Sequence, residues 1–183
     1  MCSSDLYIYS VETFSTPTPP PREKIILDKF CEKHKPMTTI IGAGPAGLFA
    51  ALRLVERGLP CRILERGKPI LERMRDISRH WKKGVLNPDS NVCFGEGGAG
   101  TFSDGKLITR IKSEHIDYVM QRFVDFGSPD EILYLANPHV GSNLIRKVIS
   151  RLSEYLQEKG CAIEYGTRVE EFHMKDSQLH SVS

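Results

Sequence analysis

The sequence predicts an α/β fold with a parallel sheet, on three observations. A short β-branched run over residues 39–41 leads directly into a glycine. Apolar residues then recur at helical spacing over residues 48–55, and Gly58 is placed to end that helix. A second apolar strand, residues 61–65, closes with Glu65. A strand–helix–strand unit of about 30 residues predicts two parallel strands joined by a right-handed crossover.

A second helix is expected over residues 70–83. Leu71, Met74, Ile77 and Trp81 fall on one side of it, and we expect this side to face the core. We expect the basic residues of the same stretch to form a solvated face. They are Arg73, Arg75, Arg79, Lys82 and Lys83.

The remaining elements follow from caps and periodicity. Residues 84–106 are glycine-rich and predicted to be irregular. Ser113 is expected to cap a helix that stops at Gly127, and residues 128–131 read as a capping box that starts another. Residues 142–158 are predicted to be helical, residues 162–165 to form a third strand, and Val169 and Phe172 to begin a fourth.

Two domains are expected. Residues 1–37 contain four prolines within residues 17–21 and are predicted to be a poorly structured leader or linker. Residues 38–183 are predicted to be the folded domain.

Composition excludes several classes of protein. Twenty-five Lys+Arg against 23 Asp+Glu give a net charge of +2, which speaks against a nucleic-acid-binding surface. No apolar run is long enough to span a membrane. The five cysteines are odd in number and lack CxxC spacing, which favours reduced thiols in a cytoplasmic protein; no metal site is predicted. We expect a small-molecule substrate, and the sequence indicates neither its identity nor the oligomeric state.

A GxGxxG motif connects the first strand to the first helix. It consists of Gly42, Ala43, Gly44, Pro45, Ala46 and Gly47. In this context Gly42 permits a tight turn, Gly44 lets a pyrophosphate approach, and Gly47 lets the helix pack closely on the strand. Glu65, 18 residues beyond Gly47, is expected to accept hydrogen bonds from ribose hydroxyls. The motif predicts a dinucleotide site and leaves open whether the ligand is NAD or FAD.

Several segments carry a resemblance to a known family. GAGPAGLFAALRLVERG followed by ILERG resembles the amino-terminal half of flavoproteins with two dinucleotide-binding domains. Residues 87–91, 95–107 and 138–141 are similar to the FAD-dependent dehydrogenases called NAD(FAD)-utilizing. The resemblance covers about residues 39–175 and departs at Asn143, where an acidic residue is expected. It implies a Rossmann-like FAD-binding domain that is incomplete at its carboxyl end.

The resemblance assigns the second glycine-rich segment to the flavin. It implies that a cradle is formed by Gly97, Gly98, Ala99, Gly100 and Thr101. Lys106 is a candidate to stabilise the reduced flavin ring, and an ordinary surface lysine is the equal alternative. Residues 100–106 also spell GxxxxGK, but Leu107 stands where a P-loop needs a hydroxyl for Mg²⁺. By the same resemblance, Arg66 and Val169 are expected beside the adenosine, and an ordinary solvated arginine is the alternative for Arg66.

The function expected is FAD-dependent oxidoreduction, with hydride transfer through flavin N5 between a donor such as NAD(P)H and an unknown substrate. No side chains form a nucleophilic triad, so no catalytic residue is assigned. We expect these residues alone to be inactive. Two alternatives stay open, namely an NAD(P)-linked dehydrogenase without flavin and a non-catalytic dinucleotide-binding module.

Overall fold

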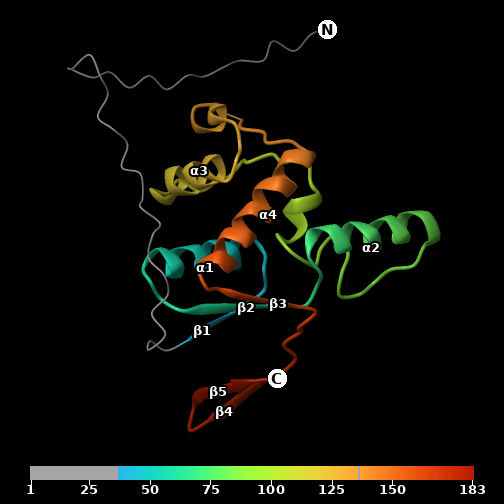
Figure 1. The fold of residues 1–183 in the computed structure, drawn as a ribbon, viewed down its shortest axis with the longest axis vertical. Helices are drawn as coiled ribbons and strands as arrows, with labels where there is room; N and C mark the ends of the chain where they lie inside the picture. Colours follow the sequence, from blue (N-terminus) through green and yellow to red (C-terminus); the bar gives the residue numbers. More distant parts are fainter. Residues whose placement is uncertain (1–36, 136) are drawn as a thin grey trace.

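A parallel three-stranded sheet organises the molecule (Figure 1). The computed structural model describes residues 37–135 and 137–183, so the predicted leader lies, except for Met37, outside the described residues. The strands are β1 (Thr38–Ile41), β2 (Cys61–Glu65) and β3 (Ala162–Tyr165), in the order β1-β2-β3. Ile41 lies opposite Leu64, and Glu65 lies opposite Tyr165. The carboxyl ends of all three strands therefore meet at one edge, where the predicted α/β fold places its ligand site.

Four α-helices accompany the sheet in the described residues. They are α1 (Pro45–Glu56), α2 (Ile70–Lys83), α3 (His115–Asp125) and α4 (Ser142–Glu158). Helices α1 and α4 contact the sheet and each other, on the same side of it (Figure 1). The helices predicted over residues 70–83 and 142–158 are confirmed with those bounds, and Gly58 ends α1 in a left-handed conformation.

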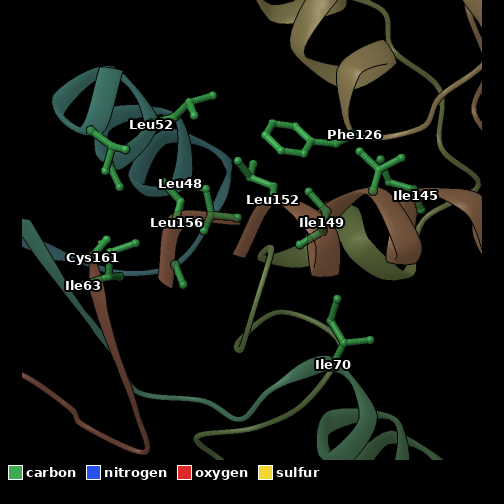
Figure 2. Packing of buried hydrophobic residues seen from close by; sticks show 14 of the residues in the cluster. Leu48, Leu52, Ile63, Ile70, Phe126, Ile145, Ile149, Leu152, Leu156 and Cys161 are labelled. Atoms are coloured by element: carbon green, nitrogen blue, oxygen red, sulfur yellow. The ribbon is translucent and has the colours of Figure 1, made fainter. Parts of the chain in front are cut away.

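The hydrophobic core lies between this helical layer and β2. Leu48 and Leu52 of α1 meet Leu152 and Leu156 of α4, with Ile63 of the strand beneath them (Figure 2). Each fully buried side chain of this kind contributes about 1.5–3 kcal/mol relative to an exposed one. This core fixes α1 on the sheet and so fixes the turn that precedes α1.

The buried face of α2 differs from the prediction. Leu71 and Trp81 are 74 % and 72 % exposed, whereas Arg73 is fully buried. Of the four residues expected in the core, only Ile77 is buried. The expectations of a core tryptophan and of a solvated Arg73 were both wrong, because Arg73 lies among backbone carbonyl groups of residues 91–98, which require a hydrogen-bond donor.

Two further elements also differ. The capping box at residues 128–131 starts only a single 3-10 turn, η2 (Asp130–Leu133), without a side-chain cap. The predicted fourth strand exists as β4 (Phe172–Lys175), but it pairs antiparallel with β5 (Gln178–Val182) in a separate hairpin. Val169 precedes that hairpin.

Of the cysteines in the described residues, Cys61 and Cys161 are buried and Cys93 is exposed. Within the described part of the chain, no helix has the length and apolar character needed to cross a membrane, and no cluster of side chains is suited to hold a metal.

Candidate dinucleotide site

The glycine turn lies between β1 and α1, at the carboxyl edge of the sheet. Gly42 has φ of +98°, a left-handed conformation that favours glycine, and its N–H donates to Leu64 O (2.8 Å). A Cβ on Gly47 would lie 2.0 Å from Gly42 O, so only glycine fits at this helix–strand contact. A Cβ on Gly44 would meet nothing within 4 Å. The first and third glycines are thus required by the fold itself, and the second leaves open space.

The amino terminus of α1 points into that open space without a side-chain cap. Gly44 is its N-cap residue, Pro45 its first residue, and no acidic side chain lies in its first turn. Unpaired N–H groups and the positive end of the helix dipole therefore remain for an anion such as a pyrophosphate.

Glu65, at the end of β2, stabilises the same turn through hydrogen bonds. Its carboxylate is buried; Oε2 accepts the Ala43 N–H and Oε1 the Gly67 N–H, both at 2.7 Å. Each carboxylate oxygen can accept a further hydrogen bond, and Glu65 also lines a cleft. The sequence predicted a ribose contact for Glu65 and did not predict these two hydrogen bonds to the backbone.

The cleft has a volume of about 480 Å³ and lies over the carboxyl ends of β1 and β2. It brings together six of the predicted site residues: Gly42, Gly44, Glu65, Arg66, Gly98 and Val169. The Arg66 guanidinium stacks 4.1 Å from the centre of the Phe94 ring and donates to Asp89 (2.8 Å). The sequence did not single out the other residues that line the cleft. They are Ile41, Leu64, Cys93, Phe94, Gly95, Thr167 and Arg168.

The second glycine-rich segment lies directly against the first. Gly97 donates its N–H to Ala43 O (2.7 Å), and a Cβ on Gly98 would lie 3.2 Å from Pro45 Cδ. Gly97 has φ of +76°, and a Cβ there would lie 2.0 Å from Thr101 Oγ1. The two motifs, separated by almost fifty residues in the chain, therefore form one continuous surface.

An apolar cavity of about 420 Å³ lies beside the cleft, on the other side of this contact. Six predicted site residues line it, namely Pro45, Ala46, Gly97, Gly100, Thr101 and Lys106. Side chains of α1, α3 and α4 also line the cavity, among them Phe49, Phe123 and Ile149. The sequence did not single these out as site residues. Ala43, Gly47 and Ala99 line neither hollow: Ala43 and Gly47 act through the turn, and Ala99 begins the 3-10 helix η1 (Ala99–Phe102).

Lys106 lies at the rim of this cavity. Its Nζ is 3.0 Å from Asp104 Oδ2, and its backbone pairs with His139. The two side chains form an exposed ion pair. The hydrogen bond from Lys106 is the main cause that lowers the pKa of Asp104. Lys106 lines the apolar cavity, whereas Asp104 does not.

The fold and the site define a dinucleotide-binding domain of the Rossmann-like α/β class, with a cleft whose lining is the more polar of the two (the polar cleft) and an adjoining apolar cavity.

Comparison with known proteins indicates which dinucleotide. Residues 36–90 match the FAD binding domain family, over the segment that holds β1, α1, β2 and α2. An uncharacterized protein of Clostridium beijerinckii is 40 % identical over 151 residues, which cover 82 % of this chain and 28 % of that protein. The chain thus spans little more than a quarter of that relative's length. The L-amino acid deaminase from Proteus vulgaris aligns with a TM-score of 0.38 and 14 % identity, over 84 % of this chain and 45 % of that one, a likeness too slight to inform fold or activity.

Proposed function

We propose that the protein is an FAD-dependent oxidoreductase whose described residues hold the cofactor. One observation carries the proposal: the polar cleft and the apolar cavity meet along the contact between the two glycine-rich segments. FAD has a comparable division into a charged adenosine diphosphate part and a flat flavin ring, of which the dimethylbenzene end is apolar. The match of residues 36–90 to the FAD binding domain family supports this choice over NAD.

The residues of the cleft suit the adenosine diphosphate part. The uncapped end of α1 supplies N–H groups to the pyrophosphate, and the second glycine of the turn leaves room for it. Glu65 accepts hydrogen bonds from the ribose, while Arg66 and Val169 flank the adenine. The cleft is therefore assigned to binding and orientation.

The residues of the cavity suit the flavin ring. FAD supplies hydride transfer through N5 of its ring, so the protein needs no nucleophile of its own. Gly97, Gly100 and Thr101 offer a flat wall, and the side chains opposite exclude water. Lys106, which lines this cavity, would stabilise negative charge on a bound ring if its ammonium group exchanged Asp104 for the ring.

The test is made on the whole natural protein that carries these residues. We expect a yellow protein that absorbs near ~450 nm and is bleached on anaerobic addition of NADH or NADPH, the expected donors. A colourless protein that binds NAD(P) instead contradicts the proposal and favours an NAD(P)-linked dehydrogenase. A yellow protein that no donor or acceptor turns over favours a non-catalytic module. Membership of the NAD(FAD)-utilizing dehydrogenases and a cytoplasmic location stay predictions.

A further inference from the structure

Arg73 of α2 holds a loop together from inside the molecule. Its side chain is the largest of those that are fully buried. All four backbone carbonyl groups that it binds lie within residues 91–98. Nε donates to Asn91 O (2.7 Å), Nη1 to Glu96 O (2.6 Å), and Nη2 to Val92 O and Gly98 O (both 2.8 Å).

Only an arginine supplies this set of donors. The guanidinium carries five N–H groups in a rigid plane, whereas a lysine carries three on a single nitrogen. The face of the same group lies 4.7 Å from the centre of the Phe102 ring. Burial lowers the pKa of Arg73 to about 10, so the side chain stays charged near neutral pH.

The loop is shaped to admit this side chain. Gly95 has φ of +122°, and a Cβ there would lie 2.5 Å from Arg73 Cδ. The attachment also runs in the opposite direction, because Glu96 Oε2 accepts the Ile70 N–H at the start of α2 (2.8 Å). Helix and loop therefore hold each other through two buried side chains, Arg73 and Glu96.

The loop that Arg73 holds contributes to both hollows. Phe94, Gly95 and Gly98 line the polar cleft, and Gly97 lines the apolar cavity. We propose that Arg73 is the positioning residue of the dinucleotide site: by binding four carbonyl groups of residues 91–98 it holds the second glycine-rich segment against the first. This inference rests on the proposed function, and it assigns a role to a residue that touches neither hollow.

The hypothesis that Arg73 only stabilises the fold and the hypothesis that it positions the loop predict different results. Loss of a structural contact lowers the free energy of unfolding and leaves the affinity of the folded protein unchanged. Loss of a positioning contact loosens residues 91–98 in the folded protein and weakens the ligand. The matched control is Leu156→Ala, which opens the core near Cys161 at the opposite, amino edge of the sheet.

The experiment compares Arg73→Met, Arg73→Lys and Leu156→Ala in the whole protein, well below the melting temperature of each. Flavin fluorescence gives the dissociation constant for FAD, and amide hydrogen exchange gives the protection of residues 91–98. For Arg73→Met we expect an affinity loss of at least ~10-fold and faster exchange in residues 91–98, because four buried acceptors lose their donors. Arg73→Lys is expected to recover part of both. Leu156→Ala is expected to melt earlier and to bind FAD within ~2-fold of the unsubstituted protein.

Unchanged FAD affinity and unchanged exchange in both Arg73 variants, or an equal affinity loss in Leu156→Ala, would overturn the inference. If Arg73→Met does not fold, Arg73→Lys decides by the same two measurements. If the unsubstituted protein binds no FAD, the proposed function fails, and the exchange measurement still decides whether Arg73 holds the loop.

Discussion

Both glycine-rich segments line the candidate site, but different contacts hold each of them in place. The first, residues 42–47, is one turn between a strand and a helix, and the regular elements on both sides fix it. The second, residues 95–105, has no strand beside it and is attached to α2, because Arg73 donates to Glu96 O and Gly98 O and the Ile70 N–H donates to the Glu96 carboxylate. The first segment has a strand and a helix as its direct neighbours in sequence, with Glu65 of the adjacent strand as a further support, whereas the second segment depends on a helix that lies about twenty residues earlier in the chain.

The largest effect is expected in the first segment, at Gly47→Ala. The new Cβ meets the backbone oxygen of Gly42, which cannot move without displacing β1 or α1. We expect a loss of about 3 kcal/mol or more in the free energy of unfolding, measured by chemical denaturation. The control, Gly44→Ala, has open space and φ of −73°, so stability should change by less than about 0.5 kcal/mol. FAD affinity should still fall at least ~10-fold in that control, because the methyl group occupies the pyrophosphate's place. Equal stability of the two variants would contradict this account.

Gly97→Ala tests the second segment in the same way. A left-handed φ of +76° and contacts with Thr101 and Ile149 predict a loss of about 2–4 kcal/mol. Thermal and urea unfolding measure it. Gly100→Ala, with nothing within 4 Å of the new Cβ, should stay within about 0.5 kcal/mol. A similar loss in both variants would mean that the segment is held less specifically than the contacts indicate.

Glu65→Gln tests the link between the first turn and β2. The amide NH₂ of glutamine cannot accept, so one of the two buried N–H groups at Ala43 and Gly67 loses its partner. We expect a loss of about 1–3 kcal/mol in stability and weaker FAD binding. Glu164→Gln, at a half-exposed carboxylate on β3, is the control and should leave both quantities unchanged. If Glu65→Gln keeps full stability but binds FAD more weakly, Glu65 serves the ribose contact and does not stabilise the turn.

Asp76 tests how α2 is attached to the residues that flank it, Lys68 before the helix and Asn87 after it. Although burial opposes ionisation, the hydrogen bond from Lys68 and the charges of Lys68 and Arg79 lower the pKa of Asp76. A carboxyl whose pKa is lower in the folded state stabilises above its unfolded value of 3.8, and this contribution is lost as pH falls through the folded pKa. Asp76→Asn should therefore cost about 1 kcal/mol at pH 7 and progressively less on acidification below pH 3.8. An equal cost at both pH values would assign the effect to shape alone.

The smallest effect is expected on the face of α2 turned away from the second segment. Trp81→Ala should change the free energy of unfolding by less than about 0.5 kcal/mol, because the indole is mostly exposed. Phe126→Ala, in the core, should cost about 3–5 kcal/mol under the same denaturation assay. A large loss of stability in Trp81→Ala would contradict this exposure and would favour the orientation of α2 that the sequence predicted.

Sequence reasoning succeeded where one local rule governs a segment. Residues 42–47 obey such a rule, since strand, glycine spacing and helix each restrict the others. The reasoning failed at α2, where apolar periodicity selected Leu71 and Trp81 while the surroundings required the donors of Arg73. A buried arginine gives no periodic signal, because its hydrogen-bond partners lie about twenty residues further along the chain.

The sequence by itself determined the α/β class, the parallel strands and the position of the first glycine turn, because hydrophobic spacing and glycine placement act over a few residues. Tertiary structure alone decided which face of α2 is buried, how the second glycine-rich segment meets the first, and that an apolar cavity adjoins the polar cleft. These features depend on hydrogen bonds and packing between segments far apart in the chain, and such contacts exist only once the core has brought those segments together.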